Sequence, residues 1–266
     1  MTLHVAQLNG THLHYADFGP KEAPVLVFSN SLGTDFRIWS DVVPVFAGTF
    51  RVVTYDARGH GLSGIGDQDY SIDLHARDLM ALLDHLDIKQ AIVCGLSVGG
   101  LIAQKLAELA PARVRGLILC DTAPKIGDSA GWNARIEAIE KGGIEILADA
   151  IMERWLSPDF HKNRPAETAL YRDMLVRTPV AGYAGTCKAI RDADLGAQAK
   201  RLAVPVLCIC GTLDLATPPD LVIAMAKRIP GAEMALIDGA GHLPCLEKPD
   251  ELSRLIDGFI KEKKLV

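Results

Sequence analysis

The segment AIVCGLSVGGL, at residues 91–101, gives the clearest structural signal in the chain. A short apolar run rich in β-branched residues leads into the pattern Gly95-x-Ser97-x-Gly99, and apolar residues at helical spacing follow it. This order predicts a strand, a sharp turn and a helix, the arrangement that exposes a nucleophilic serine at the top of a sheet. The residues two positions away from such a serine press against the adjoining strand and helix, so only glycine fits there.

The helix predicted after Ser97 adds a second feature. The first N–H groups of a helix have no partner within it, and here they would face an oxyanion forming beside the serine. The serine pattern alone is common by chance, so the rest of the chain must supply its catalytic partners.

Length and composition fit one large α/β domain or two small ones. The chain has 266 residues, of which 49% are hydrophobic and 23% charged, as in folded globular proteins. A net charge of −5 argues against a nucleic-acid-binding surface. No run approaches the roughly 18 apolar residues of a membrane span, and the N-terminus lacks a signal-peptide pattern. We therefore expect a cytoplasmic protein that binds neither nucleic acid nor membrane.

The cysteines predict no metal site and no disulfide framework. None of them forms a C-x-x-C pair, and most lie in apolar runs, where a free cysteine behaves as a small hydrophobic residue. We expect buried thiols at all six positions, namely Cys94, Cys120, Cys187, Cys208, Cys210 and Cys245.

Strand and helix patterns alternate along most of the chain. Asn9-Gly10 between two alternating runs predicts a β-hairpin. Apolar runs predict further strands at residues 25–28, 51–55, 114–120, 204–210 and 234–237. Helical patterns, the first of them capped by Ser71, are found at residues 72–86, 220–228 and 251–262. This alternation predicts an α/β fold with a mostly parallel twisted sheet of about eight strands and helices on both faces.

Residues 126–193 interrupt this alternation. They have helical composition without long β-branched runs, and they contain two of the three tryptophans. We expect a helical lid inserted between two core segments, residues 1–125 and 194–266. The lid would lie at the carboxyl ends of the strands, where ligands bind in such sheets.

A serine nucleophile needs an adjacent base, and the base needs a group that orients it. In this strand–turn–helix context the chain order is serine, acid, histidine. His242 is the single histidine after residue 161, and it lies in a loop of small residues after the last predicted strand. We therefore predict that His242 is the base.

The acid is expected after the preceding strand, where Asp214 lies. Thr217 and Pro218 have the residue types that cap the following helix, which would leave Asp214 free to orient the histidine. Asp121, at the end of the strand that follows the serine, is the best alternative. Asp238, four residues before His242, is a weaker one.

An oxyanion hole needs two N–H groups that point at the tetrahedral oxygen. One is predicted to come from Val98, directly after the nucleophile. The other is expected in the loop after residues 25–28, from Leu32 or alternatively from Ser31, although this loop is also compatible with a simple turn.

Ser97, Asp214 and His242 in this order, with DARGHG at residues 56–61 and NSLG at residues 30–33, resemble the α/β-hydrolase superfamily over essentially the whole chain. NSLGT at residues 30–34, Arg154-Trp155 and the segment at residues 183–195 resemble 3-oxoadipate enol-lactonases more closely. Thr186-Cys187 departs slightly from the pattern expected there.

The resemblance implies a carboxylic ester hydrolase that opens a five-membered enol-lactone to 3-oxoadipate in aromatic catabolism, the β-ketoadipate pathway. It implies no cofactor and no metal. Because the small-molecule substrate is acidic, a cation is expected in its pocket: Arg135 first, with Arg154 and Arg191 as alternatives. Three aromatic residues are candidates for the pocket wall, namely Trp132, Trp155 and Tyr183.

Two other functions remain open at this point. The same motifs occur in broad carboxylesterases and cofactor-free haloperoxidases or perhydrolases, and the fold also serves non-catalytic ligand-binding receptors. An intact triad argues against the receptor. The oligomeric state is not predicted.

Overall fold

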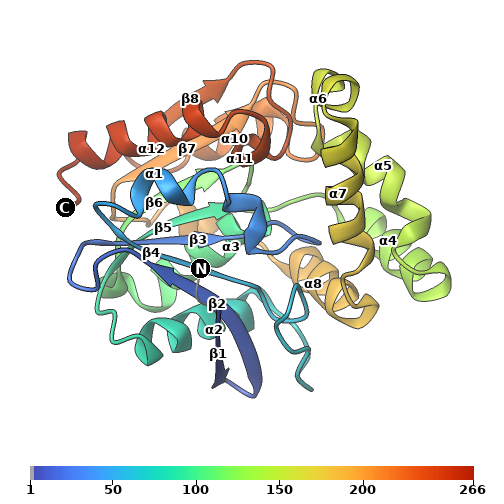
Figure 1. The fold of residues 1–266 in the computed structure, drawn as a ribbon, viewed down its shortest axis with the longest axis horizontal. Coiled ribbons are helices and arrows are strands. Elements are labelled where there is room, and N and C mark those ends of the chain that lie inside the picture. The colour runs from blue at the N-terminus through green and yellow to red at the C-terminus, as the bar shows by residue number, and fades with distance from the viewer. Residues whose placement is uncertain (1–2) are drawn as a thin grey trace.

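A single eight-stranded sheet runs through the computed structural model, which describes residues 3–266 (Figure 1). The strand order is β1-β2-β4-β3-β5-β6-β7-β8. The pairs β1–β2 and β2–β4 are antiparallel, and all the other neighbouring strands are parallel. The predicted α/β fold with a mostly parallel sheet is confirmed.

The strands after the hairpin lie where the apolar runs predicted them, within about two residues at each end. Their bounds are β1 (Leu3–Leu8), β2 (Thr11–Phe18), β3 (Val25–Ser29), β4 (Arg51–Tyr55), β5 (Ala91–Leu96), β6 (Val114–Cys120), β7 (Val206–Gly211) and β8 (Glu233–Ile237). The β1–β2 hairpin turns at Asn9 and Gly10, whose φ angles of 46° and 78° match the left-handed conformation of the predicted turn. Strands β4, β5 and β7 are buried along their whole length, as expected for strands covered on both faces.

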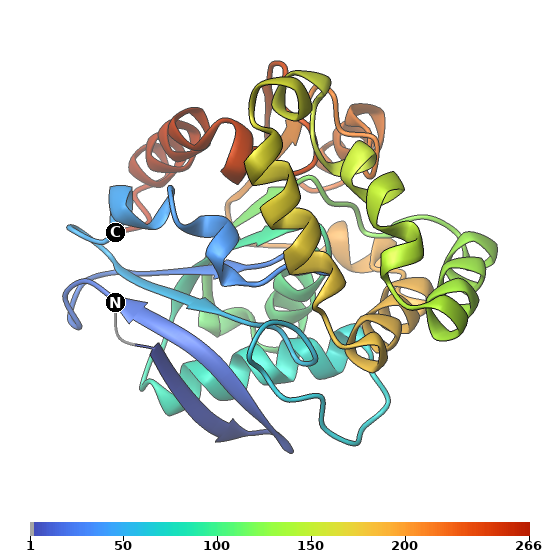
Figure 2. The same cartoon turned by 45° about the vertical axis from the view of Figure 1, so that its right-hand side comes forward.

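Helices cover both faces of the sheet. Figures 1 and 2 show α1 (Val43–Phe46) and α12 (Pro249–Glu262) on one face, and α2 (Ile72–His85) and α3 (Val98–Leu109) on the other. Ser71 caps α2 as predicted, because its hydroxyl accepts a hydrogen bond from the N–H of Leu74. The shorter elements are η1 (Phe36–Trp39), η2 (Pro111–Arg113), α9 (Gly196–Ala199), α10 (Pro219–Ala226) and α11 (Pro244–Glu247).

Five helices occupy the segment between β6 and α9. They are α4 (Ser129–Gly142), α5 (Glu145–Trp155), α6 (Pro158–Asn163), α7 (Pro165–Val176) and α8 (Val180–Asp192). Both ribbon views show them gathered beside one end of the sheet (Figures 1 and 2). The predicted helical character of residues 126–193 is confirmed.

All six cysteines are free and buried, as predicted. Within residues 3–266, no helix is long and apolar enough to cross a membrane.

The parallel strands place the candidate catalytic residues at one edge of the sheet. The carboxyl ends of β5, β7 and β8 lead directly into the segments that hold Ser97, Asp214 and His242. The end of β3 leads into the loop with Leu32, and Asp121 follows β6. Because parallel strands end at the same edge, residues far apart in sequence meet there.

Candidate active site

Ser97 occupies a strained turn between β5 and α3. Its φ and ψ angles are 57° and −117°, outside the regions that residues other than glycine usually adopt. A Cβ on Gly95 would lie 2.2 Å from the carbonyl oxygen of Gly99, and one on Gly99 would lie 2.2 Å from that of Ser29. The prediction that only glycine fits at these two positions is therefore confirmed.

Hydrogen bonds to the end of β6 and to the residues directly after it hold the turn in place. The N–H of Ser97 donates to the carbonyl of Cys120 at 2.9 Å, and the hydroxyl of Thr122 donates to the carbonyl of Ser97 at 2.6 Å. The serine side chain thereby stays at the start of α3.

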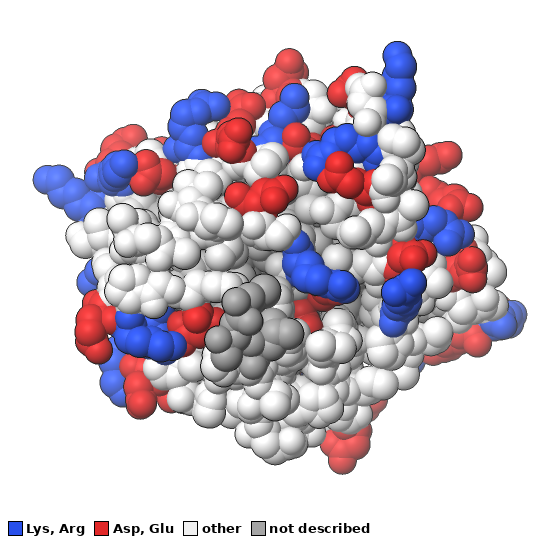
Figure 3. Space-filling model, viewed as in Figure 1, with Lys and Arg blue, Asp and Glu red and all other residues white. Residues whose placement is uncertain are grey.

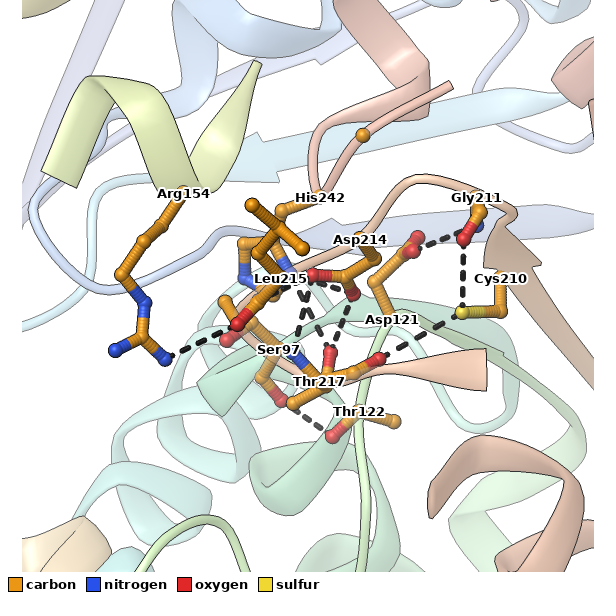
Figure 4. Close-up of polar contacts among 12 residues, drawn as sticks. Ser97, Asp121, Thr122, Arg154, Cys210, Gly211, Asp214, Leu215, Thr217 and His242 are labelled. Atoms are coloured by element: carbon orange, nitrogen blue, oxygen red, sulfur yellow. Dashed lines mark hydrogen bonds and ion pairs between the residues drawn. The ribbon is translucent and has the colours of Figure 1, made fainter. Parts of the chain in front are cut away.

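His242 and Asp214 meet in a buried hydrogen-bonded pair (Figure 4). The distance from Nδ1 of His242 to Oδ2 of Asp214 is 2.9 Å, and both side chains are almost fully buried. The backbone N–H of His242 donates to the carbonyl of Trp155 at 2.7 Å. The structure thus brings the predicted base and acid together and anchors the histidine loop to the end of α5.

Asp214 is surrounded by hydrogen-bond donors. Its Oδ1 accepts from the N–H groups of Ala216 and Thr217 at 2.7 and 3.0 Å, and its Oδ2 accepts from the Thr217 hydroxyl at 2.7 Å. Burial alone would raise the pKa of Asp214, but the charge and hydrogen bond of His242, with the bonds from Thr217, hold that pKa below its usual value. The carboxylate is therefore ionised.

The capping role expected for Thr217 and Pro218 is wrong. Pro218 is the N-cap of α10 and makes no side-chain cap, whereas the Thr217 hydroxyl binds Asp214 and lies 3.3 Å from Nδ1 of His242. Sequence reasoning missed this contact. A threonine three residues after an aspartate was the available signal, because short-range bonds of this kind are common in loops.

Ser97 and His242 both line the same cavity. Within residues 3–266, the structure records no direct hydrogen bond between the serine hydroxyl and the histidine ring. Such bonds are often long in unliganded enzymes and shorten when substrate binds.

The two alternative acids do not bond to His242. The carboxylate of Asp238 is exposed and accepts a hydrogen bond from the Thr212 hydroxyl at 3.2 Å. The carboxyl of Asp121 is buried beside Asp214, on the side toward Cys210 and Gly211 (Figure 4). Of the three acids considered, Asp214 is the one that the structure pairs with the histidine.

The predicted oxyanion donors remain available. Within residues 3–266, the N–H groups of Leu32 and Val98 donate to no recorded acceptor, and Val98 is the first residue of α3. Leu32 and Ser31 line the cavity, and the buried Ser31 hydroxyl has no hydrogen-bond partner among those residues. The hydroxyl of Thr34 and its N–H both donate to the Ser31 carbonyl, which fixes the loop.

The cavity has a volume of about 270 Å³ and lies between the sheet edge and the helices of residues 126–193. Its charged and aromatic lining consists of Asp128, Trp132, Arg135, Arg154, Trp155 and His242. Ile126, Ile151 and Ile190 supply much of its apolar wall. A cavity of this size suits a small substrate.

Arg135 and Arg154 form no ion pair with a described carboxylate. Arg135 lies over the Trp132 ring, 5.0 Å from its centroid, and donates a long 3.4 Å hydrogen bond to the Tyr183 hydroxyl. Arg154 donates to the carbonyl of Leu215 at 3.2 Å. Two guanidinium groups can thus receive an acidic ligand without first breaking an ion pair.

Two predicted pocket residues lie elsewhere. The Arg191 guanidinium pairs with Asp192 and bonds to Asn133 outside the cavity. Tyr183 is fully buried behind Arg135 rather than in the cavity wall, and burial raises the pKa of its hydroxyl. The expected wall position of Tyr183 and the expected pocket position of Arg191 are therefore wrong, because Arg135 lies between Tyr183 and the cavity and Arg191 is held by Asp192 and Asn133.

Within residues 3–266, one cluster has the side-chain types of a metal site: Asp121, Cys210 and Asp214. Two of its three side chains, Cys210 and Asp214, already use their donor atoms in hydrogen bonds. The Cys210 thiol donates to the carbonyls of Gly211 and Thr217, and the Asp214 carboxylate accepts several hydrogen bonds. These residues do not fit an additional metal ion.

Charges of both signs are interspersed over the face viewed in Figure 3. This face shows no extended basic stretch of the kind that binds a phosphate backbone.

Comparison with known proteins gives consistent similarities. A family model described as alpha/beta hydrolase fold matches residues 24–249. The protein 3-oxoadipate enol-lactonase 2 of Acinetobacter baylyi is 35% identical over 249 residues, which cover 94% of this chain and 93% of that protein. The crystal structure of the enol-lactonase from Burkholderia xenovorans LB400 is 38% identical with a TM-score of 0.94, covering 97% of this chain and 100% of that one. A thermophilic esterase from Thermogutta terrifontis, solved with malate bound, is 26% identical with a TM-score of 0.91. The match covers 98% of this chain and 99% of that one.

Proposed function

We propose that this chain, which belongs to the α/β-hydrolase family, is a serine hydrolase that opens 3-oxoadipate enol-lactone to 3-oxoadipate. The observation that carries the proposal is a small cavity lined by Ser97 and by His242, which is bonded to Asp214. Two guanidinium groups without a partner among the described carboxylates line the same cavity. The similarity to enol-lactonases supports the same substrate.

The chemical steps follow from the arrangement of three side chains. His242 takes the proton of the Ser97 hydroxyl, and the serine oxygen attacks the lactone carbonyl. Asp214 holds the imidazole through Nδ1 and stabilises the imidazolium that forms. The N–H groups of Leu32 and Val98 stabilise the oxyanion in the tetrahedral intermediate.

Ring opening breaks the bond between the carbonyl carbon and the ring oxygen, and the electron pair leaves on an enolate. The imidazolium of His242 protonates that enolate, which becomes the keto group of the product. Neutral His242 then activates a water molecule that attacks the acyl-enzyme and releases 3-oxoadipate and free Ser97. No metal or organic cofactor enters these steps.

Arg135 and Arg154 are the proposed carboxylate-binding residues. Both line the cavity, and a guanidinium can bind a carboxylate through two parallel hydrogen bonds. The indole rings of Trp132 and Trp155 form apolar walls beside them. The helices of residues 126–193, which we propose act as a lid, supply all four of these side chains.

A broad carboxylesterase is the second candidate. The similarity to the Thermogutta esterase favours it, and the triad would serve an open-chain ester in the same way. A cofactor-free perhydrolase shares the fold but has no further observation in its favour.

The proposal is tested with the Ser97→Ala variant and freshly generated enol-lactone. We expect lactone hydrolysis to fall by at least about four orders of magnitude, because no other group supplies the nucleophile. Ser253→Ala is the matched control, since Ser253 is a buried serine of α12 outside the cavity. Hydrolysis that persists in Ser97→Ala would exclude the proposed mechanism.

A further inference from the structure

Asp121 lies beside the proposed triad, yet no step of the mechanism uses it. Its side chain is fully buried, and one donor atom each from Asp121, Cys210 and Asp214 lie within 4.8 Å of one another (Figure 4). Its backbone has a φ of 46°, which is uncommon outside glycine. Its N–H donates to the carbonyl of Ile209 on β7 at 2.8 Å, so the residue is fixed in this conformation.

The two neighbouring carboxyl groups have very different hydrogen-bond partners. Asp214 accepts four hydrogen bonds, from two N–H groups, the Thr217 hydroxyl and the His242 ring. Oδ1 of Asp121 accepts one bond, from the N–H of Gly211 at 2.9 Å. Oδ2 of Asp121 is buried and has no partner among the groups that can donate to it in residues 3–266.

A proton on Asp121 accounts for the four hydrogen bonds that Asp214 accepts and for the missing partner of Oδ2 of Asp121. Two adjacent carboxylates cannot both remain ionised in surroundings that exclude water. The donors around Asp214 keep the negative charge there, so the proton belongs on the neighbour. A protonated carboxyl group is a donor, and one oxygen of the Asp214 carboxylate, a negatively charged acceptor, lies within 4.8 Å of one oxygen of Asp121.

We propose that Asp121 is a positioning residue: its protonated carboxyl group donates a hydrogen bond to Asp214 and holds this carboxylate toward His242. The proposal rests on the triad of the proposed function, although not on the identity of the lactone. The proton stays on Asp121 throughout the reaction, so no bond to substrate is made or broken there.

The electrostatic surroundings agree with a neutral Asp121. Burial, followed by the charge of Asp214, raises the pKa of Asp121 well above its usual value, and the Gly211 N–H offsets only part of this rise. The other titratable groups that face it are thiols: Cys120 on β6, Cys210 on β7 and Cys245 on α11. Burial raises the pKa of Cys210 and Cys245, and a bond to Cys94 together with burial raises that of Cys120.

A stability measurement tests the proton directly. The pKa of Asp121 is raised in the folded state, so between about pH 5 and that raised value the folded chain holds one proton that the unfolded chain has lost. The unfolding equilibrium constant of the wild type, divided by that of the Asp121→Asn variant, should therefore rise about tenfold per pH unit. A ratio between the two proteins that does not change with pH would overturn the proposal.

Infrared spectroscopy gives a second measurement that needs neither activity nor reversible unfolding. The difference spectrum of wild type minus Asp121→Asn at neutral pH should contain the C=O stretch of a protonated carboxyl group. An ionised carboxylate signal instead, including one from an Asp121 bound to a metal ion, would exclude the proposal.

Kinetic measurements on variants distinguish a positioning role of Asp121 from a catalytic one. Asp121→Leu has nearly the same size but no donor, and we expect kcat to fall about 10- to 100-fold with little change in KM. Asp121→Asn keeps an N–H donor and should recover most of that loss, whereas Asp214→Asn should lose about four orders of magnitude. A loss in Asp121→Asn as large as in Asp214→Asn would make Asp121 the catalytic acid. Hydrolysis that persists in Ser97→Ala would refute the proposed function while leaving the infrared result for Asp121 intact.

Discussion

Among single residues, Arg135 is the one that we propose sets the affinity for an acidic substrate. Its guanidinium has an aromatic ring on one side and forms no ion pair with a described carboxylate, so its charge is available to a ligand. We predict that Arg135→Ala raises KM for the enol-lactone about 10- to 100-fold and changes kcat less, because it removes binding shared by ground and transition states.

Two comparisons isolate this effect. KM for a neutral p-nitrophenyl ester should change little in Arg135→Ala, since that ester has no carboxylate. Arg191→Ala should behave as wild type, because the Arg191 side chain pairs with Asp192 outside the cavity. Unchanged lactone kinetics in Arg135→Ala would move the carboxylate site to another residue, with Arg154 as the next candidate.

The sequence predicts some residues of the site better than others. Ser97, Asp214 and His242 were predicted because each follows an apolar strand and their order along the chain is restricted. The positions of Tyr183 and Arg191 were not, although both lie on α8. Which face of this helix turns toward the cavity is decided by packing against α4, and no local pattern in the sequence states that choice.

At the scale of elements, Glu247 joins the histidine loop to the helices above it. Its Oε1 accepts from the N–H of Gly241 at 2.9 Å and, with Oε2, from the N–H of Ser157 at 3.2–3.3 Å. Burial raises the pKa of Glu247, and the bonds from Ser157 and Gly241 offset part of that rise. One side chain of α11 therefore fixes the residue before His242 and the start of α6 together.

We predict that Glu247→Ala destabilises the protein by about 2–4 kcal/mol and lowers kcat about tenfold. The substitution leaves two N–H groups without an acceptor and loosens the loop that holds His242, the proposed catalytic base. Urea unfolding and steady-state kinetics measure the two effects. Glu153→Ala, at an exposed position of α5, is the control. Equal stability of both variants would show that the Glu247 bonds contribute nothing.

The strands and core helices were predicted well because each is encoded locally by an apolar run or a helical period. The bounds of β4 and β6 match the predicted segments, and α2 begins at the predicted cap. The contact made by Glu247 could not be foreseen, since it links backbone groups 6 and 90 residues away. Hydrogen bonds of that range follow from the assembled fold and not from a local pattern.

At the scale of the whole molecule, acid should weaken the fold through His75. This residue of α2 is 1% exposed, and its Nε2 lies 3.3 Å from the hydroxyl of Thr186 on α8, between a helix that covers the sheet and the helices of residues 126–193. Burial, with the nearby His60 and Arg58, lowers the pKa of His75 to about 3. The folded protein therefore keeps this ring neutral at pH values where the unfolded chain binds a proton.

The number of protons bound in each state decides the direction in which pH changes the stability. Below the unfolded pKa of about 6.5 the unfolded chain gains a proton that the folded chain lacks, so the free energy of unfolding falls as pH falls. Between about pH 6.5 and pH 5, His75 alone should cost about 2 kcal/mol of stability. The free energy of unfolding is measured at both pH values for wild type and His75→Gln. The difference between their slopes against pH gives the contribution of His75. His12→Gln, at an exposed position of β2, is the control, and equal slopes for wild type and His75→Gln would contradict the prediction.

The most direct measurement of the proposed function compares two substrates on one enzyme preparation. The value of kcat/KM is measured for 3-oxoadipate enol-lactone and for neutral p-nitrophenyl acetate, with Ser97→Ala as the blank. Binding of the carboxylate by a guanidinium favours the lactone by about 100-fold or more, and both activities should disappear in the blank. Rapid cleavage of the neutral ester without turnover of the lactone would contradict the proposed function.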